Sequence, residues 1–336
     1  MDIDVIVNLR ARRGSAKVAD ACGRELPGAR VLLSRDPAEA VEFIRANESG
    51  RRSLLVSAGG DGTALGAVNA FRADVLRLGL LPLGTGNAWA HASGAPGWRS
   101  GIARLGAFLR AGTPPPLRRF RLVEIQGAAA RGASLLSHFA GTGWDAEVID
   151  DFRRQKDGLG ILPFSWRRGL AGYLQGVFTR TIPRHLVTPL AEVEITNLGS
   201  PALIVDADGR AVPVPGGEAG QVIYRGPAGV CAAGTIETWG FGFRAFPFAN
   251  LHPDRFCLRI YGGTAAQAAV RMRPLWRGAH PVAKMHNFLL DRCRAVFSRP
   301  VPFQAGGDPL GHRQEIEYGL ADETVDILDW SRLPSA

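Results

Sequence analysis

The sequence predicts a two-domain protein, with a doubly wound α/β domain first and an antiparallel β-sandwich-like domain after it. Three observations support this fold class. The chain of 336 residues is longer than one ordinary hydrophobic core requires, since domains mostly contain about 100–200 residues. Short apolar runs alternate with helical patterns up to about residue 120. Beyond that point, short strand-like runs are separated by Gly and Pro.

The N-terminal domain is expected to cover residues 1–120. Its apolar strand-like runs are residues 4–8, 31–34, 53–57 and 78–83. A helical pattern at residues 37–46 separates the second and third runs, with Ala40, Val41 and Ile44 at helical spacing. Strands separated by helices require crossover connections, which predicts a parallel sheet. The Thr113–Pro116 segment, with three prolines, marks the expected edge of this domain.

The C-terminal domain is expected to cover residues 121–319. Its short strand-like runs are rich in aromatic and β-branched residues, and they lie at 120–125, 135–139, 191–196, 222–224 and 256–261. One amphipathic helix is expected from about Ser165 to Thr179, and the segment 198–220 is expected to be a flexible hairpin loop. The final strand-like run, 324–330, could return to either domain, and we expect residues from about 320 to 336 to rejoin the N-terminal one.

Composition limits the class of protein. Hydrophobic residues make up 46% and charged residues 21% of the chain, which is typical of a folded protein rather than a disordered one. The net charge of +9 favours anionic partners such as phosphates or acidic membrane surfaces. The four cysteines have no metal-binding spacing, which indicates a reducing compartment. We find neither a signal peptide nor a run of about 18 apolar residues that would span a membrane.

Two glycine-rich turns are the strongest local signal. The first, Gly59-Gly60-Asp61-Gly62-Thr63, follows a strand and precedes a helix expected at residues 64–71. The second, Gly84-Thr85-Gly86-Asn87, follows the next strand. Glycines let the backbone approach a ligand closely, and the free N–H groups of a helix N-terminus favour anionic oxygen. Because parallel strands end at one edge, the two turns are expected to form a phosphate site together.

Neither turn fits the common nucleotide motifs. No Gly-Lys-Ser/Thr follows either of them, and Trp89 stands where Gly84-Thr85-Gly86 would need a third glycine. These absences weaken the interpretations as a P-loop enzyme and as an ordinary dinucleotide-binding protein. Each turn alone could also be a tight turn required by packing.

The two motifs together resemble the diacylglycerol kinase catalytic-domain family, which includes ceramide and sphingosine kinases and is distantly related to NAD kinases. Asn8 begins a segment similar to the family's Asn-Pro-x-x-Gly, with Leu9 in place of proline. Residues 141–148 are similar to its Gly-x-Gly-Phe-Asp-Ala element, and residues 247–254 to its Pro-x-Ala…Asp-Gly element, where Arg255 replaces the glycine. The resemblance implies a Rossmann-like domain and a β-sandwich domain with ATP and Mg²⁺ in the cleft between them.

The resemblance also implies roles for individual residues. Asp61 would hold nucleotide or a metal-bound water and assist catalysis. The other nucleotide-binding residues would be Asn8, Ser34, Gly59, Gly60, Gly62, Thr63, Gly84, Thr85, Gly86, Asn87, Arg153 and Arg154. Asp145 and Glu147 are expected to contact the acceptor substrate, and Asp254 to contribute weakly to a metal site. Solvated or turn-capping roles remain open for Asp145, Glu147 and the two arginines.

One departure from the family pattern bears on catalysis. Such enzymes carry Asp-Gly-Glu after a glutamine, and the Asp is regarded as the base that activates the lipid hydroxyl. Here the chain reads Gln304-Ala305-Gly306-Gly307-Asp308, so Gly306 stands where the Asp is expected and Asp308 stands at the Glu. Our hypothesis is that Asp308 carries catalysis.

The expected function is an ATP-dependent lipid kinase acting on the hydroxyl of a neutral lipid, either diacylglycerol or a ceramide or sphingoid lipid. The alternative is a regulatory pseudokinase that binds nucleotide without transfer. The lipid would be met at an anionic membrane surface, since the arginines and aromatics of residues 163–180 are typical of an interfacial helix. We expect a cytoplasmic, peripherally membrane-associated protein with no nucleic-acid partner, and the sequence leaves a homodimer open.

Overall fold

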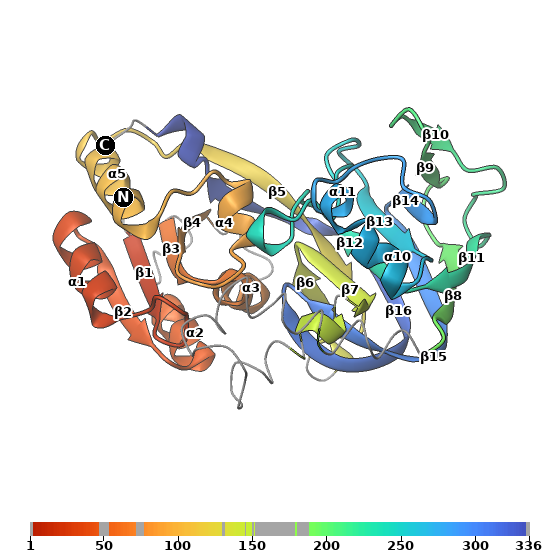
Figure 1. Ribbon diagram of the computed structural model, residues 1–336. Coiled ribbons are helices and arrows are strands. Elements are labelled where there is room, and N and C mark those ends of the chain that lie inside the picture. The colour runs from red at the N-terminus through yellow and green to blue at the C-terminus, as the bar shows by residue number, and fades with distance from the viewer. Residues whose placement is uncertain are drawn as a thin grey trace. The chain divides into compact units, whose positions relative to one another are not determined.

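The computed structural model describes residues 3–46, 54–71, 77–129, 132–144, 146–149, 151, 179 and 188–333 (Figure 1). The chain divides into two compact units. Unit 1 contains residues 1–121 and 322–336, and unit 2 contains residues 122–321. The fold class is the expected one, with a mixed α/β unit followed by a β-rich unit.

Unit 1 is built on a parallel sheet. Its strands lie in the order β2-β1-β3-β4, and the end of β16 pairs with β4 in the same direction. Their bounds are β1 Ile3–Asn8, β2 Arg30–Ser34, β3 Leu54–Gly59, β4 Arg77–Pro82 and β16 Asp308–Leu328. The C-terminal strand therefore belongs to the same sheet as the first four, and Ile327 lies opposite Leu78.

Helices cover the sheet of unit 1. They are α1 Ala16–Glu25, α2 Pro37–Arg45, α3 Asp61–Ala70, α4 Ala88–Ala92 and α5 Trp98–Arg110. Apolar side chains of α1 and α5 pack against β1 and β3 in one buried cluster, which includes Val18, Leu105, Val5 and Val56. Side chains alternate along a strand, so Ser57 points to the opposite face from Val56. Helix α3 begins at Asp61, three residues earlier than expected, because extended Gly60 serves as its N-cap.

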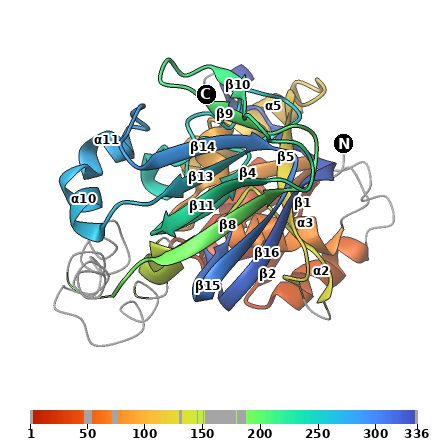
Figure 2. The same ribbon diagram turned by 90° about the vertical axis from the view of Figure 1, so that its right-hand side faces the viewer.

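Unit 2 is antiparallel. One row of strands runs β10-β9-β14-β13-β12-β7-β15-β16 (Figures 1 and 2). Strand β8 pairs with the other end of β15, β11 pairs with β8, and β5 pairs with β16 and β6. The bounds are β5 Leu117–Ile125, β6 Leu135–Ser137, β7 Phe139–Gly143, β8 Ala191–Asn197, β9 Leu203–Val205, β10 Ala211–Pro213, β11 Val222–Ala228, β12 Val230–Gly234, β13 Phe256–Tyr261, β14 Met285–Leu290 and β15 Arg292–Ala305. Residues from both sets of strands, such as Ile195 of β8 and Leu258 of β13, share one buried core.

The segment 198–220 differs from expectation. A flexible hairpin loop is the expectation, and the hairpin is present as β9 and β10, which pair with each other, but β9 also pairs with β14 and joins the sheet. Strands of three residues leave too short a pattern to be detected by alternation. Unit 2 also contains two short helices, α10 Ala265–Val270 and α11 Met272–Trp276.

All four cysteines are buried and free. Burial raises the pKa of the Cys22 and Cys257 thiols to about 12, so both remain protonated at neutral pH. Among the described residues, we find no helix with the length and apolar character needed to cross a membrane.

Candidate functional site

The two glycine-rich turns of unit 1 meet through their backbones. The carbonyl oxygen of Gly59 accepts hydrogen bonds from the N–H groups of Leu83, at 2.9 Å, and of Gly84, at 3.1 Å. A Cβ atom on Gly84 would lie 2.5 Å from the Cα atom of Gly60, which is closer than real Cβ atoms approach. Glycine is therefore required at position 84 because the two turns are in contact.

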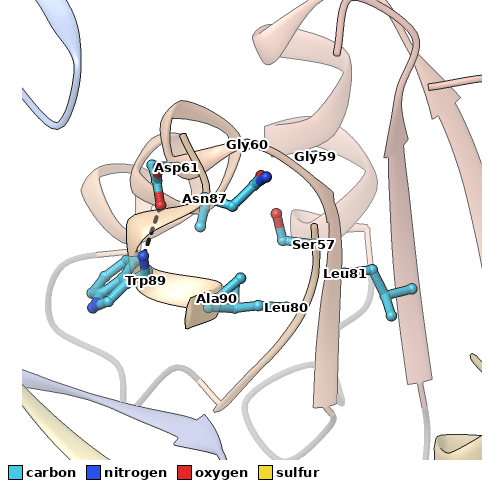
Figure 3. A pocket seen from close by; sticks show the side chains of 10 residues that line it. Ser57, Gly59, Gly60, Asp61, Leu80, Leu81, Asn87, Trp89 and Ala90 are labelled. Atoms are coloured by element: carbon cyan, nitrogen blue, oxygen red, sulfur yellow. Dashed lines mark hydrogen bonds between the residues drawn. The ribbon is translucent and has the colours of Figure 1, made fainter. Parts of the chain in front are cut away.

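Asp61 joins the turns a second time. Its carboxylate oxygens accept hydrogen bonds from the backbone N–H groups of Ala88, at 2.9 Å, and Trp89, at 3.0 Å (Figure 3). Those N–H groups open helix α4, and the first N–H groups of a helix have no partner within it. Asn87, in the left-handed conformation with φ 52°, closes the second turn, because its side chain exchanges two hydrogen bonds with the backbone of Gly84. Asp61 thus has a structural role that the sequence did not reveal.

A small pocket lies beside the joined turns (Figure 3). Its lining combines the turns with β3, β4, α3 and α4, namely Ser57, Gly59, Gly60, Asp61, Ala64, Leu80, Leu81, Asn87, Trp89 and Ala90. Ser57 is only 3% exposed, and its hydroxyl group has no hydrogen-bond partner among the described residues. A buried hydroxyl group without a partner is costly, so Ser57 is suited to hold a polar atom that enters this pocket.

The end of β1 supports the first turn. The side-chain amide of Asn8 donates to the hydroxyl oxygen of Thr63 at 2.8 Å, and its carbonyl oxygen accepts from the N–H group of Arg10 at 2.8 Å. Ser34 lies beside Asn8 in the sheet register. Its buried hydroxyl group donates to the carbonyl oxygen of Asp36 at 2.6 Å. Asn8 and Ser34 both lie at the expected sheet edge, but their side chains are engaged within the protein.

The first turn of α3 provides the anion-binding chemistry. The N–H groups of Thr63 and Ala64 bond to the carbonyl oxygen of Gly60, while those at the very start of the helix have no partner within it. α3 has ten residues, so its N-terminal end carries a partial positive charge. The remaining residues of the second turn, Thr85 and Gly86, are half-buried at the same edge. This edge of the sheet therefore combines a helix N-terminus with glycine turns, a combination that suits anionic oxygen.

Three arginines at this edge were missed by sequence reasoning. Arg10, Arg12 and Arg13 follow β1 and are exposed, and none of them forms an ion pair with another described residue. The N–H group of Arg13 donates to the carbonyl oxygen of Leu83 at 3.0 Å, which attaches this loop to the second glycine turn. The signal was a cluster of basic residues directly after a strand, at the edge where ligands bind. These cations add to the attraction for anionic oxygen.

Comparison with known proteins agrees with this geometry. Residues 5–112 match the family model described as the diacylglycerol kinase catalytic domain. That range contains both glycine turns, Asp61 and Asn87. Residues 5–112 of unit 1 are therefore similar to the diacylglycerol kinase catalytic domain.

Solved structures are similar to the whole chain in fold. A diacylglycerol kinase from Bacillus anthracis str. Sterne is 16% identical with a TM-score of 0.60, and the match covers 96% of each chain. An NAD kinase from Archaeoglobus fulgidus, solved in complex with ATP, is 12% identical with a TM-score of 0.50, covering 99% of this chain and 96% of that one. No curated protein sequence matches this chain.

The Gly306–Gly307 turn of unit 2 lies outside the matched kinase domain. It joins β15 to β16 as a two-residue hairpin, with φ angles of 58° and 86° at the two glycines. Ala305 and Asp308 lie opposite each other. The N–H group of Gly306 donates to the carbonyl oxygen of Phe139 at 2.9 Å, and that of Gly307 to the side chain of Gln304 at 3.0 Å. Half-buried Asp308 is therefore held in place by strand pairing rather than by a loose loop.

The remaining expected site residues lie either outside the described residues or in unit 2. Asp145, Arg153 and Arg154 lie outside the described residues, as does the expected helix from Ser165 apart from Thr179. Glu147 is half-buried in unit 2. Asp254 is exposed, and its backbone N–H group donates to the Nδ1 atom of His252 at 3.3 Å. Within the described part of the chain, no group of three or more His, Cys, Asp or Glu residues is arranged to hold a metal ion. Asp254 thus remains a prediction without a surrounding ligand set.

Proposed function

We propose that this chain is an ATP-dependent lipid kinase that transfers the γ-phosphate to the hydroxyl group of a neutral lipid. The observation that supports it best is the joining of the two glycine turns by Gly59, Gly84 and Asp61 at the edge of the kinase domain's sheet. Phosphoryl transfer depends mainly on positioning and charge neutralisation rather than on covalent chemistry by the protein. A rigid pair of backbone turns beside a helix N-terminus supplies such positioning.

The residues present fit a nucleotide phosphate. Space at Gly60 and Gly84 would be filled by any Cβ atom, and the unpartnered Ser57 hydroxyl group faces the adjoining pocket. Gly60 and Gly62 would hold phosphate oxygens through backbone N–H groups, with Thr63 and Asn87 beside them. When bound, Mg²⁺ neutralises phosphate charge, and it is held largely by the substrate phosphates in such sites. The protein would then need few metal ligands of its own.

In this proposal Asp308 accepts the proton of the lipid hydroxyl group. As that proton leaves, the hydroxyl oxygen bonds to the γ-phosphorus and the bond from that phosphorus to the β-phosphate oxygen breaks. Strand pairing fixes the position of Asp308 at the start of β16. Loss of a general base typically slows a reaction about 10²–10⁴-fold. Diacylglycerol is the first acceptor to test, with ceramide and sphingoid bases as its competitors, presented at a peripheral membrane surface on the cytoplasmic side.

A second candidate function is a regulatory protein that binds nucleotide without transfer. It is favoured by Gly306, which stands where the family resemblance places the catalytic aspartate. This candidate predicts ATP binding at the glycine turns and no labelled lipid.

The experiment is a transfer assay with γ-labelled ATP, Mg²⁺ and detergent-dispersed diacylglycerol, ceramide or sphingoid base, with products separated by thin-layer chromatography. We expect one labelled lipid from the wild-type protein and a loss of about 10²–10⁴-fold in Asp308→Asn. An Asp308→Asn protein with undiminished turnover would contradict the role of Asp308. ATP binding without any labelled lipid would support the second candidate.

The variant Asp61→Ala does not test whether Asp61 takes part in a catalytic step. Removal of its carboxylate leaves the N–H groups of Ala88 and Trp89 without acceptors and separates the two turns. Activity lost in Asp61→Ala would therefore report the assembly of the site and not a catalytic step.

A further inference from the structure

The helices α10 and α11 form a hairpin that is anchored to unit 2 on one side only. Side chains of Ala265, Ala268 and Leu275 are buried against Trp144 and Tyr261. A capping box fixes the start of α10, since Thr264 and Gln267 exchange side-chain to backbone hydrogen bonds. Figure 2 shows the two helices to one side of strands β13 and β14. The hairpin is thus a firmly held projection with an outer surface.

An apolar residue stands at the corner of this hairpin. Val270, the last residue of α10, is 87% exposed. The next most exposed large hydrophobic residue in the described part of the chain is Leu251, at 44%. Val270 therefore places an apolar side chain in solvent at the outer corner of the hairpin.

The charged side chains of the segment that contains this corner are all positive. From Arg255 to Leu290 the chain contains no Asp or Glu, although it contains five arginines and one lysine. Arg273 and Arg277 are exposed, lie four residues apart along α11 and its end, and form no ion pair with another described residue. Residues four apart share a helix face, so these two guanidinium groups point in a similar direction.

The carboxylate of Glu237 does not neutralise this surface. Arg244 packs against Gly278, just after α11, and its N–H group donates to the carbonyl oxygen of Trp276 at 3.0 Å. The Arg244 side chain is ion-paired with Glu237 at 2.6 Å. That pair is neutral overall and leaves the charges of Arg273 and Arg277 uncompensated.

We propose that the α10–α11 surface, defined by Val270, Arg273 and Arg277, docks on an anionic lipid bilayer. Arginines at an anionic bilayer contribute attraction while an apolar side chain on the same hairpin enters the headgroup boundary. A nucleic acid would also attract the arginines, but it offers no apolar phase for Val270. The inference concerns a surface rather than the phosphate site, so it stands whether or not the protein transfers phosphate.

The test measures binding of the full chain to sedimented vesicles, without nucleotide or acceptor lipid. Vesicles contain phosphatidylcholine alone or with about 30% phosphatidylserine, a strongly anionic composition. We expect wild-type protein to bind only the anionic vesicles. The double variant Arg273→Gln, Arg277→Gln should bind about 25-fold more weakly, at about fivefold for each cation, and Val270→Ser about threefold more weakly.

The matched control is the double variant Arg24→Gln, Arg45→Gln, which removes two exposed arginines from unit 1 and lowers the net charge equally. It should bind nearly as wild-type protein does. Equal weakening in both double variants would overturn the proposal, since total charge alone would then explain binding. Failure of wild-type protein to bind anionic vesicles would overturn it as well. Tighter binding to a single-stranded oligonucleotide, lost in Arg273→Gln, Arg277→Gln, would replace the bilayer by nucleic acid.

Discussion

Two pairs of glycines in this protein are explained by different physical causes. At Gly60 and Gly84, two turns of unit 1 touch, and a methyl group on Gly84 would fall 2.5 Å from a backbone atom. At Gly306 and Gly307, a two-residue hairpin needs positive φ angles, and a Cβ atom on Gly307 would meet nothing within 4 Å. Packing requires the first pair, whereas positive φ angles favour glycine in the second.

The difference has a consequence for catalysis. Asp and Asn enter the left-handed region more readily than other residues with side chains, and they are common in such hairpin turns. The backbone at Gly306, with φ 58°, would therefore accept an aspartate. Backbone conformation at this turn therefore does not exclude the missing carboxylate.

The largest expected effect comes from returning that carboxylate. In the Asp308→Asn background, Gly306→Asp should raise the rate of lipid phosphorylation by about 10²–10⁴-fold, because it supplies a general base at the position that the family resemblance indicates. The measurement is initial rate with γ-labelled ATP. Gly306→Asn is the control, since it adopts the same backbone conformation without a base. Equal rates for Gly306→Asp and Gly306→Asn would show that a carboxylate at this turn does not act in transfer.

A smaller effect is expected from crowding the joined turns. Gly84→Ala should lower the free energy of unfolding by about 1–3 kcal/mol, because its methyl group cannot fit beside Gly60. Denaturant unfolding measures this change. Gly66→Ala, in the exposed middle of α3 with nothing within 4 Å of its Cβ atom, should leave stability unchanged or raise it by about 0.5–1 kcal/mol. If both variants are equally stable, the contact between the turns is not rigid.

The smallest effect is expected at Ser57. Ser57→Ala should weaken ATP binding only about tenfold or less, the loss of one hydrogen bond, because backbone groups supply most of the site. Its unfolding free energy should stay equal or rise slightly, since a buried hydroxyl group without a partner is removed. Calorimetric titration and denaturant unfolding measure the two quantities. A marked loss of stability with unchanged ATP affinity would assign the Ser57 hydroxyl group a purely structural role.

Sequence patterns revealed the parallel sheet and both glycine turns, because apolar runs and glycine spacing are local properties. They did not reveal that Asp61 caps α4, since the two segments are 27 residues apart and only the folded backbone joins them. The α10–α11 hairpin was also missed, because helices of six and five residues are too short for a periodic pattern. The orphan hydroxyl group of Ser57 could not be recognised either, since strand alternation indicates a face but not a partner.

The central claim is that the joined glycine turns bind nucleotide phosphate, and a titration of ATP with Mg²⁺ tests it most directly. Gly60→Ala should fold, because Gly60 has an extended backbone and its added Cβ atom would lie 3.3 Å from Gly84. We expect wild-type protein and Gly66→Ala to bind ATP equally and Gly60→Ala to bind at least about tenfold more weakly, from crowding of the phosphate-facing turn. Equal affinity in all three proteins, or no binding by the wild-type protein, would contradict the claim.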